Sequence, residues 1–132
     1  MVTLLYKFYF LTNSPAFFIF KRMNIKDIAK SYIRYSNEVN YNAMADLFAE
    51  DAEWIPISPI EPRFGREAIR AGYLNHVKKI NKPIINDRYY ADGLTCVVEF
   101  NVEINENELA SIVDVFTFNE AGEITKLAIY KR

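Results

Sequence analysis

The chain has 132 residues, 51% of them hydrophobic and 25% charged, and its formal net charge is −1. This length suffices for one domain with a buried core, and a near-zero charge without a block of like charges excludes a basic nucleic-acid-binding footprint. One cysteine, Cys96, and one histidine exclude an internal disulfide and a Cys/His zinc site, so we expect a cytoplasmic protein without a metal.

The first 22 residues differ from the rest because they are strongly apolar and aromatic. They lack the basic start and the small-residue cleavage site of a signal peptide. They are also a poor membrane span, because Lys7, Asn13 and Pro15 interrupt the apolar stretch. We interpret residues 1–22 as an extension of the open reading frame and residues 23–132 as a single domain. Two alternatives remain open: a membrane anchor, which would add a membrane partner, and an additional packed element.

Three helices are predicted in the first part of this domain, over residues 24–39, 44–48 and 65–80. Asn24 can cap the first helix, and apolar residues follow it at helical spacing. A break at residues 40–42 separates it from the second helix. Residues 51–57 are typical of a strand, and three prolines make the stretch up to Phe64 irregular, either an edge of the sheet or a loop.

The second half of the chain predicts an antiparallel meander. Apolar and polar residues alternate between turns rich in Asn, Asp and Gly, which gives strands over residues 84–90, 94–104, 109–118 and 123–131. Residues 119–122 fit a type I turn that ends on a glycine bulge. Helices first and antiparallel strands afterwards indicate an α+β fold, with the helices packed on one face of a curved sheet.

An acidic residue interrupts the apolar face of the strand over residues 109–118. Alternate residues of a strand share a face, so Asp114 lies in a row with Ile112, Phe116 and Phe118. A buried carboxylate without a partner is unfavourable, and such a group is usually paired, hydrogen-bonded or protonated. Asp114 is therefore the first candidate for chemistry.

Three motifs and the order of the elements carry a resemblance to a known superfamily. The motifs are AEDA at residues 49–52, FGREAI at residues 64–69 and VDVFTFNEAGEI at residues 113–124. Over roughly residues 24–131 the chain resembles the nuclear transport factor 2-like superfamily, which includes SnoaL-like polyketide cyclases and ketosteroid isomerases. The resemblance implies a cystatin-like cone, in which a strongly curved antiparallel sheet surrounds a pocket closed by the three helices. It also implies a homodimer formed through the sheet.

The resemblance to ketosteroid isomerases implies roles for particular residues. A tyrosine of the first helix and a protonated aspartic acid of a late strand, which donate to a developing enolate oxygen, fall on Tyr32 and Asp114. A supporting tyrosine falls on Tyr73. The general-base aspartate falls near Pro56, where this chain has no carboxylate. An isomerase must carry a proton between two carbons, so this departure argues against steroid isomerase activity.

Two polar residues remain to be interpreted from their positions. Tyr32 lies on the apolar stripe of its helix, so its hydroxyl needs a buried partner, and we expect Asp114 to supply it. His76 lies one turn after Tyr73 and titrates near neutral pH, which makes it the candidate for the missing base. A structural tyrosine–aspartate pair and a structural histidine are the alternatives.

Large apolar side chains are expected to form the pocket wall: Phe48, Trp54, Tyr73, Phe100, Ile112 and Phe116. Because Glu53 alternates with Trp54, only one of them can face the pocket, and we assign that place to Trp54. We expect Glu61 to be solvated and Cys96 to pack in the core.

These patterns favour an enzyme that needs no cofactor. Tyr32 and Asp114 would stabilise an enolate-like oxygen of a small apolar carbonyl compound, in an isomerisation, a cyclisation or a dehydration. His76 or a water would move the proton. The alternative is a non-catalytic module of the same fold that binds an apolar ligand or dimerises.

Overall fold

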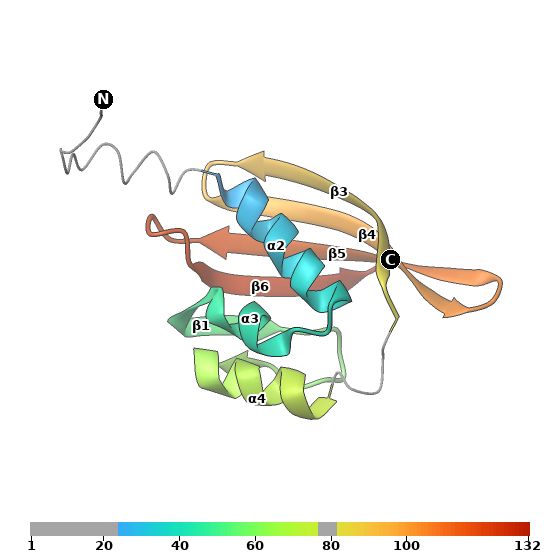
Figure 1. Cartoon of the computed structure of the whole chain (residues 1–132), viewed down its shortest axis with the longest axis horizontal. Coiled ribbons are helices and arrows are strands. Elements are labelled where there is room, and N and C mark those ends of the chain that lie inside the picture. Colours follow the sequence, from blue (N-terminus) through green and yellow to red (C-terminus); the bar gives the residue numbers. More distant parts are fainter. Residues whose placement is uncertain (1–23, 77–81) are drawn as a thin grey trace.

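The computed structural model describes residues 24–76 and 82–132 (Figure 1). In chain order the elements are α2 (Ile25–Asn37), α3 (Tyr41–Asp46), β1 (Phe48–Ile55), β2 (Arg63–Phe64), α4 (Arg66–His76), β3 (Ile84–Asp92), β4 (Thr95–Asn105), β5 (Glu108–Phe118) and β6 (Ile124–Lys131). The predicted apolar extension, residues 1–22, and the predicted end of the third helix, residues 77–80, lie outside the described residues.

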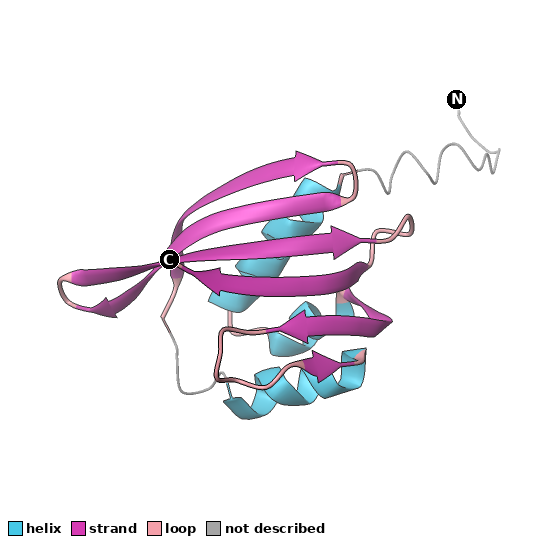
Figure 2. Ribbon diagram, turned by 180° about the vertical axis from the view of Figure 1, so that it is seen from behind, coloured by secondary structure: helices cyan, strands magenta, loops and turns pink. Residues whose placement is uncertain are grey.

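All six of these strands form one curled sheet in the order β2-β1-β6-β5-β4-β3. The antiparallel meander from β3 to β6 is as predicted. The three helices lie on one side of the sheet, and Figure 2 shows the sheet in front of them when it is seen from behind. The α+β class and the arrangement of helices on one face of a curved sheet are therefore confirmed.

The strand β1 corrects the expectation of a wholly antiparallel sheet, because it pairs in parallel with β6. It also begins three residues before the predicted strand, since Phe48 pairs with Ile124 instead of ending the second helix. The strand ends at Ile55 because Pro56, next in the chain, has no N–H to donate to a ladder. A parallel pair joins segments far apart in sequence, so the local pattern does not reveal it.

The helix boundaries are set by side-chain caps. The Asn24 side chain accepts a hydrogen bond from the Asp27 N–H at 3.2 Å, as predicted for the start of α2. The predicted break at residues 40–42 is displaced towards the N-terminus, because α2 ends at Asn37 and the Asn40 side chain accepts from the Ala43 N–H at 3.2 Å and starts α3 at Tyr41. Two asparagine caps therefore separate α2 from α3 by only a few residues.

Two turns and one short strand complete the sheet. The predicted turn at residues 91–93 is displaced, because β3 continues to Asp92 and the chain turns at Gly93, where φ is +60°. At the predicted turn over residues 119–122, the Gly122 N–H donates to the Asn119 carbonyl at 3.0 Å, and φ at Gly122 is +85°. The stretch expected to be irregular contains β2, which pairs with β1.

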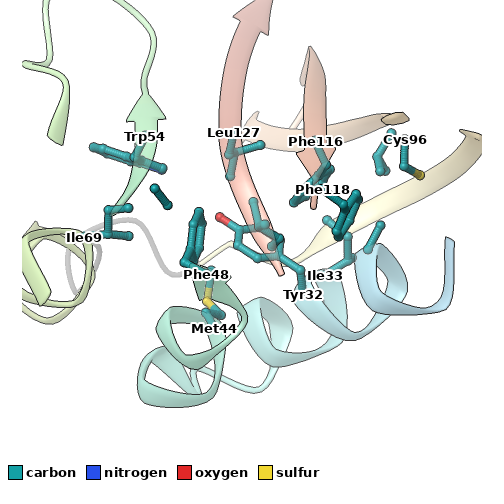
Figure 3. Packing of buried hydrophobic residues seen from close by; sticks show 14 of the residues in the cluster. Tyr32, Ile33, Met44, Phe48, Trp54, Ile69, Cys96, Phe116, Phe118 and Leu127 are labelled. Atoms are coloured by element: carbon teal, nitrogen blue, oxygen red, sulfur yellow. The ribbon is translucent and has the colours of Figure 1, made fainter. Parts of the chain in front are cut away.

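The core lies between the helices and the concave face of the sheet (Figure 3). The Tyr32 ring of α2 packs edge-on against Phe116 of β5, with ring centroids 5.0 Å apart, and against Phe48 of β1 at 6.2 Å. Phe48 and Phe116 are among the largest fully buried side chains. Aromatic contacts between the first helix and two different strands thus hold the helices over the sheet.

We predict that Phe116→Ala lowers the free energy of unfolding by about 3–5 kcal/mol, because Phe116 is fully buried and its removal leaves a cavity. Urea denaturation followed by circular dichroism measures this. The control is Tyr130→Ala, at an exposed site of β6, which should change stability by no more than about 0.5 kcal/mol. If Phe116→Ala lowers the free energy of unfolding as little as the control does, the Phe116 ring borders open space.

Candidate active site

The Asp114 carboxyl lies on the concave face of the sheet among apolar side chains. Val98 of β4 and Ile129 of β6 stand directly across from it on the neighbouring strands, and Ile112 and Phe116 share its face on β5. Asp114 is 3% exposed, and its Oδ1 has no hydrogen-bond partner among the described residues. Burial raises the pKa of the Asp114 carboxyl to about 8, so the acid is mostly protonated at neutral pH.

Tyr32 and Tyr73 bring their hydroxyls together in the same core. Tyr32 comes from α2 and Tyr73 from α4, and their oxygens are 2.5 Å apart. Burial is the largest cause that raises the pKa of both phenols, and the nearby Asp114 carboxyl raises both further. The expected partner of Tyr32 is therefore wrong: Tyr73 takes that place, because it extends from α4 into the same core and its hydroxyl meets that of Tyr32 there.

The hydrogen bond between Tyr32 and Tyr73 involves only one of their two hydroxyl protons. Two hydroxyls carry two protons, and only one proton can lie between the two oxygens. The other O–H has no acceptor among the described hydrogen bonds. A buried donor left without an acceptor is unfavourable, so the pair is suited to donate to an oxygen of a bound molecule.

Asp114 and the tyrosine pair occupy neighbouring parts of one interior. Phe116, against which Tyr32 packs, lies two residues from Asp114 on the same face of β5. This spacing corresponds to about 7 Å along a strand. The structure therefore places the three predicted residues Tyr32, Tyr73 and Asp114 in one interior, without a hydrogen bond between the carboxyl and either phenol among the described contacts.

The residues expected to form the pocket wall are all buried in the core cluster, namely Phe48, Trp54, Tyr73, Phe100, Ile112 and Phe116. Trp54 points inward and Glu53 is half-buried, as the alternation predicts, and Pro56 is buried. Glu61 is exposed and Cys96 is buried, also as expected. That the six residues line a ligand cavity stays a prediction.

His76 is the last residue of α4, and its side chain lies outside the part of the chain that the structure describes. Its role as the base therefore stays a prediction. The position near Pro56 is flanked by Glu53, a strand residue that pairs with Phe64 and Lys126. In the described part, no carboxylate is placed where the resemblance puts the base.

A surface groove of about 550 Å³ runs between α2 and β3. Charged, polar and apolar side chains line it: Lys30, Ile33, Arg34, Asn37, Glu38, Asp87 and Tyr89. Tyr89 stands opposite Val98, which in turn stands opposite Asp114, so the groove reaches one end of the row that holds the buried acid. Sequence reasoning missed Tyr89, although it shares a face of its strand with Ala91 and alternates with Arg88 and Tyr90.

The Tyr89 hydroxyl donates to Asp87 Oδ2 at 2.6 Å. Partial burial is the largest cause that raises the pKa of Tyr89, followed by Asp87. Within the described ranges, no three His, Cys, Asp or Glu side chains gather as a metal site, and no helix there is long and apolar enough to span a membrane.

The sequence pattern of the SnoaL-like domain family matches residues 29–127. No curated protein resembles the chain closely enough in sequence to count as a match.

Similar solved structures agree with this family match. The epoxide hydrolase/cyclase-like enzyme SalBIII, of pyran ring formation in the polyether salinomycin, is 26% identical, with a TM-score of 0.68 over 82% of this chain and 90% of SalBIII. A candidate polyketide cyclase from Xanthomonas campestris pv. campestris is 17% identical, with a TM-score of 0.71 over 84% of this chain and 92% of that one. An NTF2-like protein of unknown function from Cytophaga hutchinsonii is 17% identical, with a TM-score of 0.66 over 83% of this chain and 90% of that one.

We predict that the Asp114 carboxyl titrates near pH 8, which ¹³C NMR of the side-chain carboxyl measures directly. Because its pKa is raised in the folded state, its contribution to stability is present below about pH 4 and is lost as the pH rises through about 8. Between these values, Asp114→Asn should gain stability over the wild type by up to about 1.4 kcal/mol per pH unit. Titration near pH 4, with a pH-independent difference between the two proteins, would contradict the neutral acid.

Proposed function

Because the chain belongs to the SnoaL-like domain family, we propose that it is an enzyme that binds an apolar carbonyl compound and stabilises negative charge on its oxygen. One observation carries the proposal: Asp114 is buried, protonated at neutral pH and without a partner for its Oδ1 among the described residues. A neutral carboxylic acid in an apolar site donates a hydrogen bond without repelling the charge that develops.

The donors act on the same oxygen during the reaction. Asp114 and the unused O–H of the Tyr32–Tyr73 pair donate to the carbonyl oxygen, and these bonds strengthen as the oxygen becomes enolate-like. The donors are fixed by packing before the substrate arrives, and the surrounding side chains exclude water. A hydrogen-bond donor placed in this way contributes about 10²–10³-fold to turnover.

The proton is moved by another group, since Asp114 and the phenols remain protonated. We assign this role to His76, one helical turn after Tyr73. His76 takes a proton from the carbon beside the carbonyl, the electron pair of that C–H bond forms a carbon–carbon double bond, and the π pair of the carbonyl moves onto its oxygen. In a β,γ-unsaturated ketone the enolate is conjugated with the second double bond, and return of the proton to the γ-carbon completes an isomerisation. Attack of the enolate carbon on a second carbonyl of the molecule, with protonation of that second oxygen, closes a ring.

Ring closure is also supported by the similarity to SalBIII, whose name connects it with pyran ring formation. Closure of an oxygen-containing ring develops negative charge on a leaving or attacked oxygen, which the same neutral donors would stabilise. The buried proline at position 56 distinguishes this chain from the ketosteroid isomerases that it resembles.

A second candidate function is a non-catalytic module that binds an apolar ligand. The observation that favours it is the packing of all six expected wall residues in one core cluster, together with the missing carboxylate near Pro56. Such a module would retain its ligand after loss of one hydrogen bond, whereas an enzyme would lose turnover.

We predict that Tyr32→Phe lowers turnover by about 10²–10³-fold while the protein stays folded, because it removes one hydroxyl of the buried pair. The measurement is exchange of the protons beside the carbonyl of a cyclic ketone into D₂O, followed by NMR. Tyr35→Phe, on the same helix and outside the pair, is the matched control. A ketone that binds the wild type but shows no catalysed exchange would favour the binding module.

We also propose that two copies pair through the sheet face that points away from the helices. No described element covers this face in Figure 2. A cross-strand row of Tyr90, Val97, Val115 and Ala128 lies on it, and its first three members give it apolar surface, whereas Ala128 is buried. A second copy of the chain would remove this surface from water.

For this pairing we predict that the wild type sediments at twice its chain mass of 15.4 kDa. Val115→Lys should shift the equilibrium towards the monomer, since it places a charge in the middle of the row. Val115→Thr, which conserves the shape of the side chain, serves as the control and should remain largely dimeric. A monomeric wild type at micromolar concentrations would contradict the proposal.

A further inference from the structure

Trp54, the only tryptophan of the chain, has a polar group that the mechanism above does not use. It lies on β1 and is 9% exposed, and its indole Nε1 is buried without a hydrogen-bond partner among the described residues. An indole N–H is a donor only, and a buried donor without an acceptor is rare in folded proteins. The observation therefore points to an acceptor that arrives with a ligand.

The surroundings of Trp54 place this N–H beside the tyrosine pair. Its ring packs edge-on against Tyr73, with centroids 5.8 Å apart and planes at 82°. The indole N–H lies near enough to the Tyr73 hydroxyl to lower its pKa, although the geometry is not that of a hydrogen bond. In Figure 3 the Tyr32 hydroxyl points towards Phe48, on the side of the cluster where Trp54 lies.

The interior therefore contains more donors than acceptors. Its donors are the Trp54 N–H, the unused O–H of the Tyr32–Tyr73 pair and the protonated Asp114 carboxyl. A ligand with N–H or O–H groups would add further donors to this set. A ligand with carbonyl or ether oxygens would satisfy it.

The positions of the donors separate two oxygen sites. Trp54 stands in one row with Leu127 and Phe116 on three neighbouring strands, which corresponds to about 10 Å between the outer two residues. Asp114 lies two residues further along β5, and the tyrosine pair lies between the two ends. The unpartnered polar atoms of Asp114 and Trp54 therefore lie at opposite ends of this arrangement.

We propose that the substrate carries two separated acceptor oxygens and that Trp54 Nε1–H binds the second of them. This inference rests on the proposed function, in which the first oxygen is bound by Asp114 and the tyrosine pair. It narrows the substrate class to apolar compounds with two carbonyl or ether oxygens and makes Trp54 the residue that selects them. A compound with only the reacting oxygen leaves the indole donor unpaired and binds less tightly.

The test compares two probes of the same skeleton, 1-decalone with one carbonyl and decalin-1,5-dione with two. Because the chain has one tryptophan, a ¹H–¹⁵N spectrum of the uniformly labelled full chain shows a single indole N–H resonance. We expect the dione to shift this resonance downfield and the monoketone to leave it nearly unchanged. This measurement uses the wild type and does not depend on the stability of a variant.

Calorimetry of Trp54→Phe, which keeps an aromatic ring and removes the N–H, supplies the second measurement. We expect the Kd of the dione to rise about tenfold and that of the monoketone to change less than about twofold. Asp114→Leu is the comparison and should weaken both ketones, because both use the first oxygen site.

Each outcome decides between the two proposals. In one outcome both ketones bind and their binding depends on Asp114, but the indole resonance does not shift and Trp54→Phe has no selective effect. The second oxygen site is then overturned and the proposed function stands. If neither ketone binds the wild type, or binding does not depend on Asp114, the proposed function fails and the second site fails with it. A selective effect of Trp54→Phe on the dione, together with the downfield shift, supports both.

Discussion

The burial of one carboxyl in the middle of an apolar sheet face is the constraint on which the site depends. Asp114 is flanked by aliphatic and aromatic side chains on its own strand and on both neighbouring strands. No cation or donor among the described residues stabilises its charged form, so it holds its proton at neutral pH. The chemistry open to this interior is therefore that of a neutral donor.

The two tyrosines, which come from the helices, are also polar groups buried in this interior. Tyr32 and Tyr73 lie 41 residues apart, and each hydroxyl is buried where water is excluded. Their mutual hydrogen bond satisfies one proton and leaves the other without an acceptor, as is also the case for the Trp54 indole. Buried unsatisfied donors lower stability, and folded proteins commonly tolerate such groups where they serve binding or catalysis.

Membership of the SnoaL-like domain family establishes the architecture more firmly than the reaction, because one fold accommodates many unrelated sites. The departures of this chain are local. A buried proline stands where the resemblance to ketosteroid isomerases places the base, and Trp54, two residues earlier in the chain, contributes an unpaired donor. Pro56 and Trp54 lie on β1 or just after it, on the side of the interior opposite β3. In the proposed function they would determine which substrates fit, while the Asp114 end of the interior keeps its acid.

Features that depend on neighbouring positions in the chain could be predicted from the sequence. Strand alternation predicted that Asp114 and Trp54 point inward, and cap and turn chemistry predicted the roles of Asn24 and Gly122. The α+β class followed from the order of the elements, because periodicity and turn residues act within a few positions of each other.

Features that join distant segments were decided only by the tertiary structure. The parallel pairing of β1 with β6 and the choice of Tyr73 over Asp114 as the partner of Tyr32 are the main examples. The sequence by itself determined which side chains had to be buried and which of them were polar. Which buried polar groups meet depends on how helices and strands pack across the core, and that geometry has no local signature in the chain.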